Sequence, residues 1–310
     1  MKSFIDRVDP ELLPGLDFSE AFPPPTTIDE LHSFRSKTTA DTTYADCSGV
    51  TFQDRITDGL RLRVFTPAGA GPHPAIYWIH GGGMIAGSVD HDTPYCTVLS
   101  GETGAVVVAV DYRLSPEHPF PAPLDDVHAG LQWLFASAEV LSIDPHRVAV
   151  AGSSAGGGLA AGLTLLNRDN GGPRIAFQYL MYPMLDHTHT SNSSREFHDI
   201  PTWNRAHSQF AWQCYLGAGQ PSPPIYAAPA AAEDLAALPP TLIQVGDLDL
   251  FRDEDINYAT RLSNAGVPTE LHVYPGAYHG YELNCPTSSL GAQTLTDRNR
   301  ALTKALHPSC

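Results

Sequence analysis

Short apolar runs alternate with amphipathic stretches through most of this 310-residue sequence. Residues 75–79 and 105–110 are apolar and rich in β-branched side chains, as expected of strands buried on both faces. Similar strands are expected at 147–151, 175–181, 241–245 and 270–274. Helices are expected at 123–138, 155–167 and 253–265. This rhythm predicts an α/β fold with a mostly parallel central sheet flanked by helices.

The N-terminal part of the sequence does not follow this rhythm. Residues 23–25 are three prolines, and Thr27 with Glu30 forms a capping-box pattern that predicts the start of a helix. Two strand-like runs at 50–56 and 60–66 are separated by an Asp-Gly turn and predict a β-hairpin. We therefore separate an N-terminal segment, 1–46, from a larger domain, 47–310.

A polar, aromatic-rich insertion at about 187–219 interrupts the rhythm further along the chain. It is either a surface excursion whose aromatic side chains pack on the main body or a lid over a site. Its position within the α/β rhythm favours the lid. Its large aromatic residues are Phe197, Trp203, Phe210, Trp212 and Tyr215.

The charge balance argues against two classes of partner. The formal net charge of −16 disfavours nucleic acids and anionic membranes, since both require a cationic protein face. No stretch approaches the roughly 18 apolar residues of a membrane span, and the first residues lack the apolar core of a signal peptide. These features predict a cytoplasmic protein.

The cysteines and histidines do not indicate a metal centre or a disulfide framework. The cysteines are odd in number, widely spaced and without a CxxC pair, which favours free thiols in a reducing compartment. The tightest histidine cluster, His187-Thr188-His189, has no carboxylate or cysteine to complete a ligand set, so no metal is expected. The five cysteines are Cys47, Cys96, Cys214, Cys285 and Cys310.

A candidate nucleophile follows the apolar run at 147–151. Gly152-Ser153-Ser154-Ala155-Gly156 fits G-x-S-x-G between an expected strand and an expected helix, which is the context of a nucleophile elbow. Small neighbours allow the tight turn, and the helix N-terminus stabilises negative charge beside the serine oxygen. We therefore expect Ser154 to be a nucleophile.

A serine nucleophile needs a base, usually an imidazole oriented by a carboxylate. His279 lies in a glycine-containing loop just after an expected strand, downstream of Ser154 as the serine–acid–histidine order requires. Asp247 and Asp249 both lie between them and directly after a strand. Position alone does not choose between these two aspartates.

His80-Gly81-Gly82-Gly83 follows the strand expected at 75–79 and fits an HGGG-type oxyanion motif. Glycines allow backbone N–H groups to approach the oxyanion that forms when an ester carbonyl is attacked. A plain glycine-rich turn explains the glycines, but it does not explain this motif about 70 residues before an elbow.

These motifs, taken together, resemble the hormone-sensitive-lipase-like branch of the α/β-hydrolases, a group of carboxylesterases with a helical cap. The resemblance spans about residues 75–281 in the right order. The sequence departs from the family at Ser153, where an aspartate or threonine is usual, and at Leu250, where proline is common. The matching stretches are 80–83, 111–122, 152–157, 232–235, 238–240, 252–254 and 278–280.

The resemblance implies roles that spacing leaves open. It selects Asp249, three residues before Arg252, as the catalytic acid, and it assigns the oxyanion hole to the amides of Gly82, Gly83 and Ala155. It further implies a cap built from the N-terminal segment, 1–46, and the insertion at 187–219. His80 and Arg113 are expected to order loops rather than to react. An acyl pocket is expected among Met84, Ile85, Trp203, Phe210, Trp212 and Tyr281.

The expected function is hydrolysis of short- to medium-chain carboxylic esters through an acyl-enzyme, without a cofactor. The triad attacks any activated carbonyl, so a lactone, carbamate or amide substrate stays open. A ligand-binding family member without turnover is disfavoured, because such receptors lack the histidine that stands here at position 279. The expected partners are a small-molecule ester and, at most, a second copy of the chain in a homodimer.

Overall fold

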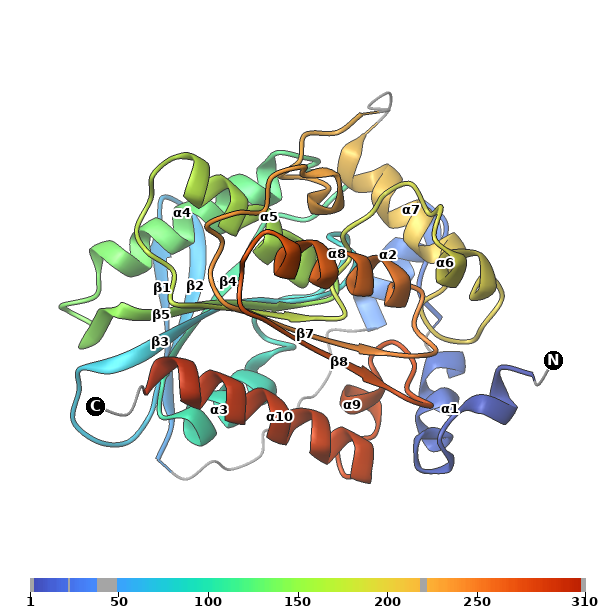
Figure 1. Cartoon of the computed structure of the whole chain (residues 1–310), viewed down its shortest axis with the longest axis horizontal. Helices are drawn as coiled ribbons and strands as arrows, with labels where there is room; N and C mark the ends of the chain where they lie inside the picture. The colour runs from blue at the N-terminus through green and yellow to red at the C-terminus, as the bar shows by residue number, and fades with distance from the viewer. Residues whose placement is uncertain (1–2, 22, 38–48, 218–221, 308–310) are drawn as a thin grey trace.

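The computed structural model describes residues 3–21, 23–37, 49–217 and 222–307 (Figure 1). Across these ranges, eight strands form one sheet in the order β1-β2-β4-β3-β5-β6-β7-β8. β1 and β2 form the expected antiparallel hairpin at one edge, and the strands from β4 to β8 are parallel. The strands are β1 Thr51–Thr57, β2 Leu60–Thr66, β3 His73–Ile79, β4 Val106–Asp111, β5 Ile143–Ser153, β6 Phe177–Met181, β7 Thr241–Gly246 and β8 Thr269–Tyr274.

Helices cover both faces of this sheet, which confirms the predicted fold class. α4, α5 and α8 lie on one face, and α3 and α10 lie on the other (Figure 1). Successive residues of a strand point to opposite faces of the sheet. Tyr77 therefore packs in the apolar layer beneath α4, α5 and α8, and Trp78 packs in the layer beneath α3 and α10. The helices are α1 Pro14–Ala21, α2 Ile28–Lys37, α3 Thr93–Thr103, α4 Ala122–Ala136, α5 Ala155–Asp169, α6 Asn192–Glu196, α7 Arg205–Leu216, α8 Arg252–Asn264, α9 Tyr281–Asn284 and α10 Ser289–Leu306, with short 3₁₀ turns at Ile5–Arg7, Pro10–Leu12 and Pro229–Ala231.

The helices α3 and α10 are not predicted by the hydrophobic pattern. Hydroxyl side chains occupy much of the buried face of α3, and Thr294 and Arg298 interrupt the apolar residues on the buried face of α10. In α3, Thr97 and Thr103 donate to the carbonyl oxygens of Thr93 and Leu99 one turn back, which satisfies their hydroxyls inside the core. Tertiary burial, rather than local propensity, holds these two helices.

The N-terminal segment packs on the insertion and on the loop after β8. Val8 and Leu12 share an apolar cluster with Phe197 of the insertion and with Tyr278. The predicted cap at Thr27 is present, because the Glu30 N–H donates to Thr27 Oγ1 over 3.3 Å, and the Glu30 carboxylate accepts from the backbone N–H of Thr26, one residue before the cap. The proposed division at 46 and the end of the insertion at 219 lie outside the described residues, as do Cys47 and Cys310.

No helix within the described part of the chain is both long enough and apolar enough to span a membrane. Cys96, Cys214 and Cys285 are free thiols in this part of the chain.

Candidate active site

Ser154 lies in a sharp turn between β5 and α5. Its backbone has φ 55° and ψ −120°, a strained conformation for a residue with a side chain. Its N–H donates to the carbonyl oxygen of Met181 over 2.8 Å, which ties the turn to the end of β6. A Cβ on Gly156 would lie 2.1 Å from the carbonyl oxygen of Ile79, so only glycine allows α5 to begin this close to β3. The predicted elbow therefore has the expected strand–turn–helix geometry.

His279 and Asp249 come from two neighbouring loops that are joined by backbone bonds. The N–H of Leu248 donates to the carbonyl oxygen of Ala277 over 3.0 Å. The N–H of Gly276 donates to Asp247 Oδ1 over 2.7 Å. Of the two aspartates that spacing left open, Asp247 thus faces the backbone of the His279 loop, and Asp249 faces the imidazole.

Two hydrogen bonds connect the three candidate catalytic side chains. Ser154 Oγ lies 2.9 Å from His279 Nε2, and His279 Nδ1 lies 2.8 Å from Asp249 Oδ2. A carboxylate only accepts, so Nδ1 carries the hydrogen and Nε2 accepts from the hydroxyl. Asp249 is fully buried, and its other oxygen accepts from the Phe251 N–H over 2.9 Å. This arrangement holds the imidazole in the tautomer that removes a proton from Ser154.

Aromatic rings surround the imidazole on the sides not used by these bonds. The ring centroid of Tyr182 lies 4.4 Å from that of His279, and the edge-on ring of Phe251 lies 5.2 Å away. Trp203 of the insertion lies 6.3 Å from the same ring. Tyr182 and Phe251 were not predicted from the sequence as site residues. The available signal was position alone, since each closely follows a parallel strand at the edge that carries Ser154.

The glycine loop after β3 presents amides beside Ser154. Within the described chain, no acceptor takes the N–H groups of Gly82, Gly83 and Ala155. Gly83 has φ +64°, and a Cβ there would lie 2.7 Å from the Trp203 ring, so the loop requires glycine on both counts. Free amides that border a nucleophile are the groups that stabilise an oxyanion.

His80, at the start of this loop, is held in place by contacts with Tyr112. Its ring stacks on Tyr112 with centroids 4.1 Å apart, and the Tyr112 hydroxyl donates to the His80 carbonyl oxygen over 2.9 Å. Burial lowers the pKa of His80, which keeps its ring neutral. Arg113 pairs with Asp126 of α4 over 2.8 Å. Both residues have the structural contacts that the sequence favoured over direct chemistry.

The six predicted pocket residues do not all lie together. Met84, Ile85 and Trp212 are buried in one apolar cluster, with Trp203 and Phe210 packed against it. Tyr281 belongs to a different cluster with Tyr274, and its hydroxyl bonds to Thr294 of α10. The structure therefore separates Tyr281 from the other five.

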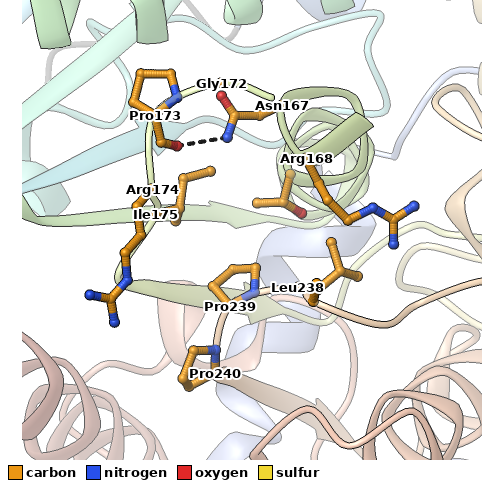
Figure 2. A pocket seen from close by; sticks show the side chains of 11 residues that line it. Asn167, Arg168, Gly172, Pro173, Arg174, Ile175, Leu238, Pro239 and Pro240 are labelled. Carbon is orange, nitrogen blue, oxygen red and sulfur yellow. Dashed lines mark hydrogen bonds between the residues drawn. The ribbon is translucent and has the colours of Figure 1, made fainter. Parts of the chain in front are cut away.

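A cavity of about 310 Å³ lies far from these residues. It is bordered by Ile175 before β6 and Pro240 before β7, so it lies at the amino ends of the parallel strands, opposite Ser154. Asn167 donates to the carbonyl oxygen of Pro173 at its rim over 2.8 Å (Figure 2). The Arg168 guanidinium there is held by Asp169 and by two carbonyl oxygens. The cavity is therefore separate from the candidate active site.

Comparisons with known proteins agree with this geometry. A family model described as alpha/beta hydrolase fold matches residues 76–283. Esterase LipI of Mycobacterium tuberculosis (strain ATCC 25618 / H37Rv) is 40% identical over 210 residues, which cover 67% of this chain and 65% of that protein. Carboxylesterase NlhH of the same strain is 38% identical over 262 residues, 82% of this chain and 81% of its own. The solved structure of a bacterial heroin esterase is 37% identical with a TM-score of 0.90, covering 98% of this chain and 99% of that one.

Proposed function

The chain belongs to the α/β-hydrolase fold family, and from this premise we propose that it is a carboxylic ester hydrolase with Ser154 as nucleophile. The observation that carries the proposal is the bonded series Ser154–His279–Asp249 beside three free amides. The hormone-sensitive-lipase-like resemblance seen in the sequence is confirmed by the family match and by the carboxylesterases among the relatives.

Acylation begins when His279 Nε2 takes the proton of Ser154 as its Oγ attacks the ester carbonyl carbon. The carbonyl oxygen becomes an oxyanion, which the amides of Gly82, Gly83 and Ala155 stabilise. Collapse of this intermediate breaks the bond to the alcohol, which leaves with the proton from His279. Water then repeats the sequence on the acyl-enzyme: His279 takes its proton, the acid departs and Ser154 regains its hydrogen. Asp249 stabilises the imidazolium in both halves.

The direct test is the rate of hydrolysis of p-nitrophenyl esters whose acyl chains have about two to sixteen carbons, a range from short to long acyl groups. Matched p-nitroanilides serve as amide controls. We expect burst kinetics and turnover on esters, with far slower turnover on the anilides. Faster cleavage of the anilides than of the esters would indicate an amidase instead of an esterase. Absence of turnover on both substrates would contradict the proposed hydrolase.

We expect ester specificity to pass through a maximum with acyl length. Each added methylene gains about 0.8 kcal/mol of burial until the pocket is full. Trp203 lies against Gly83 and Trp212 is buried in the same apolar cluster, so a longer chain must displace packed rings. Overpacking of this kind costs about 1–3 kcal/mol. The kcat/KM should be highest at roughly four to eight carbons. An equally high kcat/KM on esters with acyl chains of about sixteen carbons would contradict an enclosed pocket.

We further propose that the N-terminal segment, 1–46, and the insertion at 187–219 form a cap over the domain 47–310. The support is a set of contacts made by Arg35 of α2. Its Nε donates to the carbonyl oxygen of Ile85 over 2.6 Å, in the loop that follows Gly83. Its other nitrogens bond the Ser115 carbonyl oxygen over 2.7 Å and the Glu117 carboxylate over 2.7 and 3.1 Å. Arg35 thereby links the segment to the loop that carries the free amides.

Arg35→Ala is expected to lower kcat about tenfold and the free energy of unfolding by about 1–2 kcal/mol. The reason is that the amide-bearing loop loses its bonds to α2. Urea unfolding and ester turnover measure the two effects. Arg147→Ala is the matched control, since Arg147 also binds a carboxylate and a backbone carbonyl, but near the amino end of β5, at the opposite end of this strand from Ser154. It should lose stability and keep kcat. Equal losses of kcat in both variants would contradict the link.

The partner that the family supports is a small-molecule ester. We propose a cytoplasmic location on the basis of the free thiols Cys96, Cys214 and Cys285, which suit a reducing compartment. A homodimer is the assembly we propose to test, by light scattering. The net charge of −16 argues against nucleic acid as a partner.

A further inference from the structure

A buried tyrosine–glutamate pair lies directly behind His279. Tyr182 follows β6, and its hydroxyl donates to Glu282 Oε1 over 2.5 Å. Glu282 stands three residues after His279, in the first turn of α9, and is 2% exposed. Its second oxygen, Oε2, is buried without a partner among the described residues. A carboxyl group in such a position costs the fold stability, so a role in holding the chain together does not explain it.

We propose that Tyr182 and Glu282 are a positioning pair for His279: Tyr182 holds the imidazole against Ser154 and Asp249, and the Glu282 carboxylate stabilises its cationic form. This inference rests on the proposed function, because it assigns the pair to the step in which His279 becomes an imidazolium.

Tyr182 is held rigidly enough to act as a support. It has φ 35°, a strained backbone for a residue with a side chain, and its N–H donates to the carbonyl oxygen of Gln244 over 2.6 Å. Its ring meets the imidazole at 4.4 Å with an interplanar angle of 58°. An aromatic face within about 6 Å of a cation attracts it, so this contact strengthens when His279 is protonated.

The charge of Glu282 also acts on His279, and this charge depends on pH. Burial raises the pKa of Glu282 to about 7, against which the Tyr182 hydrogen bond works. Glu282 is therefore mostly protonated in mild acid and mostly ionised above neutrality. The titratable groups that face it from other elements are Tyr179 of β6, Tyr182 after β6, Asp249 after β7 and Tyr95 of α3, and those on its own loop and helix are Tyr278, His279 and Tyr281. The buried Arg298 of α10 lies over the Tyr95 ring and pairs with Glu102.

The pH dependence of stability has the opposite sign to that of catalysis. Between the usual carboxyl value of 4.5 and a pKa of about 7, the folded chain binds more protons at Glu282 than the unfolded chain. The contribution of Glu282 to stability is therefore greatest below that window and falls as pH rises through it. The support for the imidazolium increases over the same window. A residue with a purely structural role would not separate the two in this way.

The experiment compares wild type, Glu282→Gln and Tyr182→Phe by kcat and KM on one ester between about pH 5.5 and 8.5, together with thermal unfolding. For Glu282→Gln we expect kcat about tenfold below wild type at the alkaline end, within about twofold at the acid end, and KM little changed. Its melting temperature above neutrality should equal or exceed that of wild type. Tyr182→Phe keeps the ring and removes the donor, so its gain in kcat with pH should appear at higher pH than in wild type.

Tyr274→Phe is the matched control, since Tyr274 is also buried and hydroxyl-bonded but makes no contact with His279 among the described contacts. Its pH profile should follow wild type. The proposal is overturned if Glu282→Gln matches wild type at every pH, if its deficit is the same at every pH, or if Tyr274→Phe reproduces it. Labelling of Ser154 by a fluorophosphonate is scored separately. If wild type and Ser154→Ala hydrolyse the ester equally, the proposed function fails, whatever Glu282 does.

Discussion

Ser154→Ala is expected to lower kcat for ester hydrolysis by about 10⁶-fold. The hydroxyl oxygen is the atom that becomes bonded to the acyl group, and it lies 2.9 Å from His279 Nε2, the nitrogen that takes its proton. Alanine keeps the Cβ and therefore the strained turn with φ 55°, so the fold should be retained. The measurement is ester turnover by purified protein, with circular dichroism to verify folding.

The adjacent serine provides the control for this variant. Ser153 ends β5, where it pairs with Met181 of β6, and it makes no hydrogen bond with His279 among the described contacts. Ser153→Ala should therefore keep clear activity. A rate for Ser154→Ala above roughly 10⁻² of the wild-type rate would be far more than the residual activity expected after loss of a nucleophile. Another residue would then have to be the nucleophile.

Asp249→Asn is expected to lower kcat by about 10⁴-fold. Asp249 Oδ2 accepts from His279 Nδ1 over 2.8 Å, and an amide nitrogen in that place would donate instead. The imidazole would then carry its hydrogen on Nε2, which faces Ser154 and could no longer accept the hydroxyl proton. Turnover and KM, measured together, should show the loss mainly in kcat.

Asp247→Asn tests the same loop without touching the imidazole. Asp247 Oδ1 accepts from the Gly276 N–H over 2.7 Å, and an asparagine oxygen can still accept there. We expect a loss within about tenfold. A larger loss for Asp247→Asn than for Asp249→Asn would reverse the assignment of the acid.

The sheet and the elbow were predictable because each depends on local pattern. Apolar β-branched runs predict buried strands, and the spacing around Ser154 leaves little freedom for the turn. The helix α3 was not predictable, since its hydroxyl side chains are buried only because the sheet lies beneath them. Tyr182 has no motif of its own, and its contact with His279 depends on how β6 and β8 are ordered in the sheet. The choice of Asp249 over Asp247 came from the family resemblance, because alternate residues of one short loop cannot be oriented from spacing.

The joined loops of Asp249 and His279 bear on how the chain could be divided. These two residues are 30 positions apart and belong to one β7–α8–β8 unit, whereas His279 and Ser154 are 125 positions apart. A cut between α7 and β7 would thus place the nucleophile and the free amides on one fragment and the acid and base on the other. The two fragments would meet along the β6–β7 ladder, from Gln178 opposite Thr241 to Met181 opposite Gln244. Neither fragment alone holds the serine together with its acid and base. Release of coloured p-nitrophenol from an ester would therefore report only the reassembly of the two fragments. The chain thus has the layout of a split reporter enzyme.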